Sequence, residues 1–493
     1  MPFVSAVSPR SFGTIRTQIP ARLDRLPWSR FHWRIVAGLG TAWILDGLEV
    51  TIVGSIGARL TVPGSGIALT PALIGTAGAI YVAGACLGAL FFGQLTDRYG
   101  RKRLMLITLG VYITATVITA FSFAPWFFFL CRFFTGTGIG GEYAAVNSAI
   151  DELIPARHRG QVDITINGSY WMGSAVGGLA ALLFLDQAIF ALNVGWRISF
   201  AVGATLGLVI FLIRRTVPES PRWLFIHGHD PEAEAIVGKI EASTESEVHH
   251  QLDTPGASIT VRQRRSIPFR EIARVAIKYY PTRMVLGVAL FIGQAFLYNA
   301  VTFNLGTILS TFYGVSSGIV PIYIVIFALG NLTGAVFLSR FFDTLGRKPM
   351  ISGTYLISSA ITVILGILLV RGGLTSISFI AFVAVTFFFA SAGASAAYLT
   401  VSEIFPMETR ALAIALFYAV GTGLGGIIGP VLFGNLIAGG PSAIAIGFFI
   451  GAAVMAAGGI AELTLGVRAE RMPLENIAKP LTVADAEQGQ QNR

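Results

Sequence analysis

A charged segment between two apolar runs, residues 93–103, constrains the fold of this chain more than any other feature. It holds one acid, Asp97, together with four basic residues and two glycines. Charges in this number are not stable in hydrocarbon, so the segment is predicted to be a tight polar turn at a membrane face. A second copy, residues 339–348, keeps the acid (Asp343), the glycine and the basic pair at the same offsets between two further apolar runs.

A second motif, Glu-x-x-Pro-x-x-x-Arg, occurs at 152–159 and again at 403–410. Its two copies are 251 residues apart, and Asp97 and Asp343 are 246 residues apart. Two motifs that recur in the same order at nearly one offset predict two homologous halves, because a chance match of both is implausible. Parallel internal repeats are a known plan of secondary transporters.

The composition places the chain in a membrane. Of its 493 residues, 54% are hydrophobic and 12% are charged, against about 25% charged in soluble domains. The formal charge of +9 could suggest a nucleic-acid partner, but 31 of the 35 Lys and Arg residues fall on one side if the spans alternate. This positive-inside pattern excludes that partner and places both termini in the cytoplasm of a cell-membrane protein. Cys86 and Cys131 lie in apolar runs, so no disulfide framework is expected.

Twelve apolar runs are long enough to cross a membrane. We therefore predict an all-α integral membrane protein with twelve transmembrane helices in two homologous six-helix bundles. The predicted spans are 34–57, 72–95, 104–122, 127–149, 162–184, 196–215, 282–311, 319–339, 349–370, 376–400, 412–437 and 442–466. The predicted divisions are an N-terminal cytoplasmic segment (1–33), a bundle (34–215), a cytoplasmic linker (216–281), a second bundle (282–466) and a cytoplasmic tail (467–493).

The linker is the only sizeable polar insert. Asp230 is expected to cap a short helix that runs to about Ile240, and residues 243–260 are expected to be flexible. His249 and His250 are interpreted as solvated surface rather than as metal ligands. The sequence has no phosphate-binding glycine loop, metal-ligand spacing or nucleophile elbow, so neither an enzyme nor a metal or cofactor site is expected.

The repeated charged loops at 93–103, 152–159, 339–348 and 403–410 resemble those of the major facilitator superfamily. The likeness extends from about residue 34 to 466. Within the superfamily the chain is similar to the sugar porters and the metabolite–proton symporters. The residues that carry the likeness are Arg132, Gly136, Gly138, Gly140, Glu152, Pro155, Arg159 and Gly160, with the blocks 218–224 and 402–406. The resemblance implies the superfamily's fold and transport by alternating access; we expect a monomer that binds a small molecule and protons.

In that superfamily the repeated charged loops form a cytoplasmic gate. The resemblance assigns this gate to Asp97, Arg98, Arg101, Glu152, Arg159, Asp343, Arg347, Glu403 and Arg410. The simpler alternative is that the loops only fix the topology. That alternative explains the basic residues but not the matched acids.

Buried charges within spans are the strongest functional indicators in a membrane sequence. Glu49 lies 15 residues after Arg34, which is roughly 22 Å from the cytoplasmic face. Arg132 lies 6 residues after Trp126, roughly 9 Å from the outer face, and in a core of about 30 Å the two depths agree. We expect the two side chains to pair and to couple transport to protons; the alternative is a static ion pair. Asp46, one turn below Glu49, is either a second proton site or a packing residue.

Four further side chains are expected to bind substrate: Asn167, Gln294, Asn299 and Tyr398. By resemblance, Gln294 and Asn299 of the span 282–311 stand where porters bind substrate. Asn167 of the span 162–184 stands where the porters often have glutamine, and Tyr398 of the span 376–400 where they often have tryptophan. The alternative for the amides is hydrogen bonding between helices. Glu142 lies near the cytoplasmic end of the span 127–149, and we interpret it as a residue that stabilises the structure.

The favoured function is proton-coupled uptake of a small polar metabolite, either an organic acid or a sugar-like polyol. Proton-driven efflux is the alternative, because residues 173–178 nearly match the Gly-Pro-x-x-Gly-Gly element of efflux members but lack its proline. A nutrient sensor is disfavoured because little chain follows Gly466, and a channel is disfavoured because no re-entrant filter segment is visible.

Overall fold

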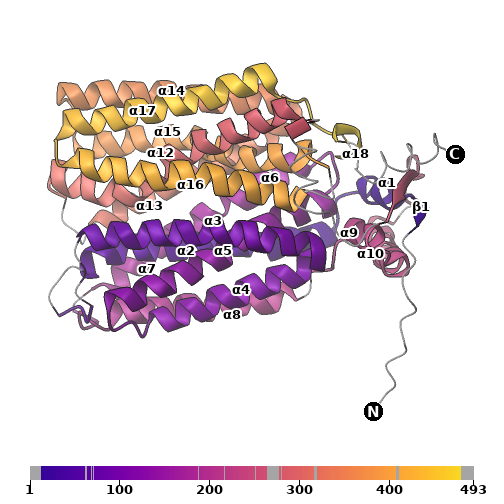
Figure 1. Cartoon of the computed structure of the whole chain (residues 1–493), viewed down its shortest axis with the longest axis horizontal. Helices are drawn as coiled ribbons and strands as arrows, with labels where there is room; N and C mark the ends of the chain where they lie inside the picture. Colours follow the sequence, from indigo (N-terminus) through magenta and orange to yellow (C-terminus); the bar gives the residue numbers. More distant parts are fainter. Residues whose placement is uncertain are drawn as a thin grey trace, which may run out of the picture.

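The apolar runs form two helical bundles that lie side by side (Figure 1). The computed structural model describes residues 13–60, 64–67, 69, 71–186, 188–215, 217–249, 251–263, 277–278, 280–315, 319–406, 410–472 and 474–478. The first bundle contains α2 (Arg30–Leu60), α3 (Pro71–Tyr99), α4 (Arg101–Thr119), α5 (Pro125–Leu153), α6 (Arg159–Gly168), α7 (Tyr170–Phe184) and α8 (Gly195–Arg214). The second contains α12 (Pro281–Tyr313), α13 (Val320–Thr344), α14 (Arg347–Arg371), α15 (Ser376–Ile404), α16 (Arg410–Ile437) and α17 (Pro441–Leu465).

Ten of these helices are long and apolar enough to cross a membrane by length and composition. The other two predicted crossings correspond to α5 and to the pair α6–α7. α5 has 29 residues but carries Arg132 and Glu142 within its apolar stretch, and α6 and α7 have only 10 and 15 residues. Within the described residues, the predicted all-α fold class is therefore confirmed.

The predicted fifth span is not one continuous helix, because it breaks at Ser169 between α6 and α7. The Ser169 hydroxyl lies 2.6 Å from the carbonyl oxygen of Ile166 and 3.0 Å from that of Gly40. A hydroxyl that bonds a main-chain carbonyl competes with the helical ladder, and such sites are common positions for helix bends. At the preceding Gly168, an added Cβ would lie 2.4 Å from the Cβ of Ala335, so only glycine allows α6 to approach α13 this closely.

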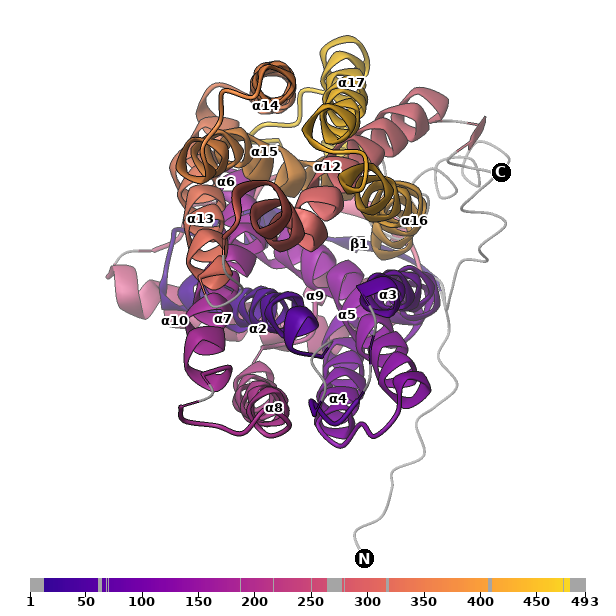
Figure 2. The ribbon, with the colours of Figure 1, turned by 90° about the vertical axis from the view of Figure 1, so that its left-hand side faces the viewer.

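The same packing pairs occur in both bundles. Helix α2 packs on α7 as α12 packs on α16, α3 packs on α5 as α13 on α15, and α4 packs on α8 as α14 on α17. The main contacts between the bundles are α3 with α16 and α7 with α13, and an end-on view shows the two bundles meeting along these helices (Figure 2). The repeated pairs agree with the two homologous halves that the loop motifs predict.

Glycine lets α2 and α7 approach closely, as expected for membrane helices. A Cβ added at Gly47 would lie 1.8 Å from the carbonyl oxygen of Tyr170. A Cβ added at Gly173 would lie 1.7 Å from the carbonyl oxygen of Ile44. The two helices therefore meet backbone to backbone, next to the cavity described below.

One end of the bundles carries a small additional layer, which we call the cap (Figure 1). The cap contains β1 (Thr14–Thr17), α1 (Ile19–Asp24), α9 (Pro221–Ile226), α10 (Asp230–Val248) and β2 (Ile259–Arg262). It has its own apolar core, in which Leu23, Phe225, Val237 and Val261 are buried. The short helix α18 (Leu474–Ile477) lies at the same end.

The cap corrects three expectations for the linker. Helix α10 continues past Ile240 to Val248, and its N-cap residue is His229 rather than Asp230. Asp230 instead accepts a hydrogen bond from the Gln263 amide at 2.6 Å. Residues 243–260 are not a flexible linker throughout, because β2 pairs antiparallel with β1. His249 ends α10 in the left-handed conformation, with φ of 56°, and His250 lies outside the described residues.

Candidate functional site

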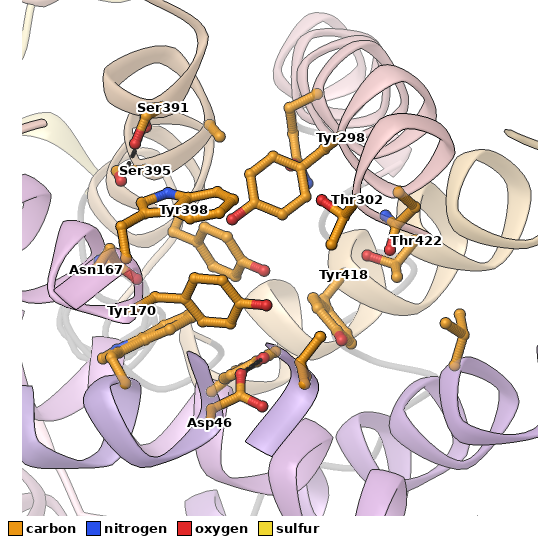
Figure 3. A pocket seen from close by; sticks show the side chains of 18 of the residues that line it. Asp46, Asn167, Tyr170, Tyr298, Thr302, Ser391, Ser395, Tyr398, Tyr418 and Thr422 are labelled. Carbon is orange, nitrogen blue, oxygen red and sulfur yellow. Dashed lines mark hydrogen bonds between the residues drawn. The ribbon is translucent and has the colours of Figure 1, made fainter. Parts of the chain in front are cut away.

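A cavity of about 100 Å³ lies between the two bundles. An engineered cavity of roughly 150 Å³ holds one benzene molecule, so this smaller space limits a bound molecule to at most about the size of one ring. Both halves contribute to its wall, and Figure 3 shows Asp46, Tyr170 and Tyr298 converging on it. The lining residues are Trp43, Asp46, Val50, Tyr81, Val82, Tyr143, Asn167, Tyr170, Trp171, Gln294, Tyr298, Asn299, Thr302, Phe303, Ser391, Ala394, Ser395, Tyr398, Tyr418 and Thr422.

Aromatic rings form much of the wall. The rings of Trp43 and Tyr143 are stacked, with centroids 4.4 Å apart and planes within 6°. Tyr418 meets Tyr143 edge-on at 5.0 Å, and Tyr398 meets Trp43 edge-on at 5.9 Å. Tyr143 and Trp43 belong to the first bundle and Tyr398 and Tyr418 to the second, so this aromatic cluster joins the halves at the cavity.

Asp46 is the one acidic side chain among the described lining residues, which include no Lys, Arg or His. It is buried in α2, and its carboxylate accepts hydrogen bonds from the hydroxyls of Tyr143 and Tyr81, the latter at 3.1 Å. Neither partner carries a positive charge. The cavity therefore contains a carboxylate that is hydrogen-bonded but has no cationic partner among the described residues.

Glu49 and Arg132 form an ion pair, with Glu49 Oε1 2.6 Å from Arg132 Nη1. The exposed fractions of the two side chains are 3% and 1%, so the pair is shielded from water. Arg132 Nη2 also donates to the hydroxyls of Thr119 at 2.8 Å and Thr135 at 3.2 Å. The guanidinium lies 4.9 Å from the ring centre of Phe200, where the ring face attracts a cation.

This ion pair lies beside the central cavity. Glu49 and Arg132 line a smaller cavity that shares Val50, Tyr81 and Phe303 with the central one. Tyr81, whose hydroxyl bonds Asp46, therefore lies between the two carboxylates of α2. The structure brings together all three predicted proton-coupling residues. Asp46 and Glu49 lie one helical turn apart on α2, and Arg132 lies on the facing helix α5.

The four predicted substrate-binding residues all line the central cavity. The amide nitrogen of Asn167 donates to the Asn147 side-chain oxygen at 3.0 Å and to the Asp163 carbonyl at 2.8 Å. That of Asn299 donates to the carbonyl of Ala295 at 2.8 Å. These bonds use both amide hydrogens of Asn167 and one of the two of Asn299, so the helix-contact role and a substrate role are both compatible with the geometry.

Sequence reasoning missed most of the wall. The omitted lining residues include eight aromatic residues and the hydroxyls of four others. The aromatic residues are Trp43, Tyr81, Tyr143, Tyr170, Trp171, Tyr298, Phe303 and Tyr418, and the hydroxyls are those of Thr302, Ser391, Ser395 and Thr422. The available signal was tyrosine and tryptophan in the middle of a span, since these residues normally favour the membrane interfaces.

Most of the predicted gate residues gather at the cap end of the bundles. Arg101 Nη2 lies 2.9 Å from Glu152 Oε1 in the first half. In the second half Arg347 Nε lies 3.0 Å from Glu403 Oε2, and Arg347 Nη1 lies 2.7 Å from Asp343 Oδ1. The two halves thus build the same ion pair from the repeated motifs.

Two predicted gate residues are not part of this cluster as described. Arg98 is exposed at the end of α3, and its guanidinium lies 5.2 Å from the ring centre of Tyr99. The side chain of Asp97 lies outside the described residues.

Further contacts of the cluster cross from one half to the other. Arg159 Nη1 lies 3.9 Å from Glu403 Oε1, and Arg410 Nε lies 3.6 Å from Asp151 Oδ2. The backbone N–H of Gln161 donates to Asp343 Oδ2 at 2.6 Å. These side chains are buried, so the cluster closes the cap end of the cavity against solvent.

A repeated acid that sequence reasoning missed supports each of the two turns. Gly100 and Gly346 have φ of 98° and 107°, which favours glycine, and each precedes the first turn of a helix. Glu219 Oε1 accepts from the N–H of Arg101 at 2.9 Å, and Glu470 Oε2 accepts from that of Arg347 at 3.4 Å. A carboxylate at a helix N-terminus is stabilised by the free N–H groups there. Burial raises the pKa of Glu219, and these N–H groups oppose the rise.

The cap also contributes to the cluster, which the sequence did not predict. Asp24, at the end of α1, lies 3.5 Å from Arg159 Nη2 and 3.2 Å from Arg222 Nη2. Glu142 pairs with Arg214 between α5 and α8, in keeping with its structural interpretation.

Comparison with known proteins decides the family. A model of the family described as sugar (and other) transporters matches residues 59–476, most of the chain. The chain belongs to that family. It is a major facilitator superfamily transporter of the sugar-porter type, as the loop motifs predicted, and therefore a multi-pass membrane protein that carries a small molecule.

Two relatives and one solved structure illustrate the likeness. The niacin transporter NiaP of Acinetobacter baylyi is 27% identical over 426 residues, covering 85% of this chain and 90% of that protein. The putative metabolite transport protein YdjK of Escherichia coli is 29% identical over 475 residues, covering 93% and 96%. The proton:xylose symporter XylE bound to 6-bromo-6-deoxy-D-glucose superposes with a TM-score of 0.75 at 20% identity, covering 91% and 98%. These proteins are transporters, which points away from an enzyme.

Proposed function

We propose that this sugar-family transporter takes up a small polar metabolite together with protons, by alternating access. One observation carries the proposal. Two carboxylates lie one turn apart on α2: Asp46 lines the central cavity without a cationic partner among the described residues, and Glu49 lies beside it against the buried Arg132. Ionisable groups inside a membrane protein are costly and mark ion or substrate pathways.

The ion pair provides a switch that a proton can operate. A proton on Glu49 removes its charge and weakens its bond to Arg132, whose guanidinium then remains buried with only the hydroxyls of Thr119 and Thr135. An unpaired buried charge is unfavourable, so the protonated state favours a rearrangement of α2 against α5. In this proposal Asp46, which accepts a hydrogen bond from Tyr81 of the same region, takes up a proton from the cavity side.

Alternating access also needs a closed end that can open. The charge cluster joins the halves at the cap end, which the positive-inside pattern assigns to the cytoplasm of the cell membrane. Opening toward the cytoplasm requires the contacts of Arg159 with Glu403 and of Arg410 with Asp151 to separate. The proposed unit is one chain, because both halves of the cavity and of the cluster come from it.

The cavity favours an uncharged ring with hydroxyl or amide groups over an organic acid. Its described wall offers aromatic faces, hydroxyls and amides but no basic side chain that would neutralise a bound carboxylate. An unpaired buried anion is costly, and Asp46 would repel it. A sugar-like polyol or a neutral heterocycle instead satisfies both the rings and the hydrogen-bonding groups.

The test is uptake of matched pairs by purified protein in vesicles, with an inward proton gradient. The pairs are xylose with xylonate and nicotinamide with nicotinate, which differ in charge but little in size. We expect uphill accumulation of an uncharged member, accompanied by alkalinisation of the outer medium. Accumulation without proton movement would refute coupling, and faster loss from loaded vesicles under the same gradient would identify efflux instead. Preference for the acids would refute the substrate assignment.

A further inference from the structure

Between the cavity and the charge cluster lies a carboxylate that the proposed coupling does not use. Asp163 is in α6, one turn before the cavity residue Asn167, and its exposed fraction is 0%. The Asn167 amide donates to the Asp163 main-chain carbonyl at 2.8 Å. Asp163 therefore lies on the short segment that connects the substrate cavity to Arg159 at the start of the same helix.

The Asp163 carboxylate forms no ion pair with any described residue, and the one side chain that offers it a hydrogen bond is the neutral amide of Asn167, which already donates to two other oxygens. The charged groups that act on it are Asp151 of α5, Glu403 of α15 and Arg347 of α14. The two acids repel a negative charge on Asp163. Arg347, the cation that attracts this charge, is already bonded to both Glu403 and Asp343.

The other charged groups on the helices packed against α6 have partners elsewhere or face solvent. Helix α7 has no charged residue. Arg159, one turn earlier on α6 itself, pairs with Asp24. The remaining groups are Asp343 of α13 with Arg347, Glu49 of α2 with Arg132 of α5, Glu142 of α5 with Arg214, Glu152 of α5 with Arg101, Asp46 of α2 with two tyrosines, His32 of α2 with Ser29, and the exposed Arg30, Arg34 and Arg340. The described surroundings therefore offer Asp163 no buried Lys or Arg that is not already paired with another acid.

We propose that Asp163 is a second proton-binding site, which holds a proton while the cap end is closed and releases it to water when that end opens. A buried ionised carboxylate without a partner is so unfavourable that the group takes up a proton instead. Separation of α6 from α15 admits water and removes the repulsion from Glu403. The carboxylic acid then ionises and its proton leaves as hydronium on the cap side.

This site links opening of the cap end to the pH on that side. The closed state holds one proton more than the open state. The ratio of open to closed molecules therefore rises about tenfold per pH unit, over the pH range in which the open state has released this proton and the closed state still holds it. The inference rests on the proposed function only in identifying this proton as one that is transported. The dependence of opening on pH needs neither a substrate nor a gradient.

The experiment measures opening directly by electron–electron distance spectroscopy. Spin labels are placed at the exposed positions Arg103 of α4 and Thr344 of α13, on opposite halves of the cap end, in a background where Cys86 and Cys131 are replaced by serine. The open fraction is read in nanodiscs over a series of pH values. Three spin-labelled proteins are compared: the parent, which keeps Asp163, the variant Asp163→Asn and the conservative variant Asp163→Glu.

With Asp163 we expect the logarithm of the open-to-closed ratio to rise with pH, and Asp163→Asn to lower that slope by about one proton and to keep the end closed. Asp163→Glu should restore the slope, which a purely structural residue would not do. An unchanged slope in Asp163→Asn overturns the proposal. If the slope falls as expected but vesicles of the parent protein show no proton-driven uptake, the proposed function fails while the proton site stands.

Discussion

Replacement of Arg132 by alanine tests the ion pair most severely. The guanidinium bonds Glu49 at 2.6 Å and the hydroxyl of Thr119 at 2.8 Å, and both charged side chains are almost fully buried. Arg132→Ala leaves the Glu49 carboxylate inside the protein without a cation. Breaking one partner of a buried pair costs about 3–5 kcal/mol.

The companion variant Glu49→Gln costs less, because the amide retains the size and part of the hydrogen bonding of the carboxylate. The double variant removes both charges, so it avoids the unpaired buried carboxylate that makes Arg132→Ala alone so unfavourable. We therefore expect Arg132→Ala with Glu49→Gln to be more stable than Arg132→Ala alone. The cycle gives a coupling free energy of about 2 kcal/mol or more.

The measurements are thermal unfolding of the four proteins in one detergent, and transport in vesicles. Glu49→Gln should lose uphill accumulation but keep counterflow of substrate, since its protonation no longer changes a charge. If the two single variants are additive in stability, the pair does not carry the energy assigned to it. If Glu49→Gln still accumulates substrate in response to a proton gradient, Glu49 is not the coupling group and Asp46 is the next candidate.

Three further predictions follow from the packing, the charge cluster and the cap. Gly47→Ala should destabilise the protein by about 3 kcal/mol or more, because the new Cβ would lie 1.8 Å from the Tyr170 carbonyl oxygen; unfolding in detergent measures this. Arg101→Glu should reduce uptake at least about tenfold without loss of the protein from the membrane, because it places two acids together at Glu152. Burial lowers the pKa of His227 to about 4, so between its ordinary value and about 4 only the unfolded cap binds the proton. Lowering the pH from 7.5 to 5.5 should therefore raise local opening of the cap about tenfold in hydrogen exchange, after correction for intrinsic rates.

Each of these predictions has a matched control. Gly110→Ala meets no atom within 4 Å and should be nearly neutral, so equal losses at both glycines would contradict the packing argument. Arg103→Ala removes an exposed charge beside Arg101 and should leave uptake unchanged. His227→Gln should remove the pH dependence of exchange in the cap, and its persistence there would assign the effect to another group.

The sequence predicted the helical fold and the contact between Glu49 and Arg132, for identifiable reasons. The spans were visible because each is a long apolar run, and the pairing geometry of Glu49 and Arg132 followed from a constant helical rise. The aromatic wall was not predictable, because the rotation of each helix decides whether a mid-span tyrosine faces lipid or the cavity. The bend at Ser169 was hidden because small residues occur in every span.

Interactions between distant parts of the chain could also not be predicted from the sequence. The strand residues Thr14 and Arg262 pair although 248 positions separate them, and neither segment has a strong strand pattern of its own. Glu470 supports the second turn from a segment that departs from the usual motif, so its role appears only from its distance to Arg347. Asp163 was overlooked because it resembles one more polar residue at a span end.

The pairing of β1 with β2 changes where this chain can be divided. The connection between the halves remains attached to the first bundle as far as Gln263, whose N–H donates to the Gly13 carbonyl at 2.8 Å and whose amide bonds Phe225 and Asp230. Two separately expressed polypeptides that meet after Gln263 should therefore reassemble into a working carrier. A break between α9 and α10 would divide the core of the cap, so a two-gene version of this protein has its natural junction after β2.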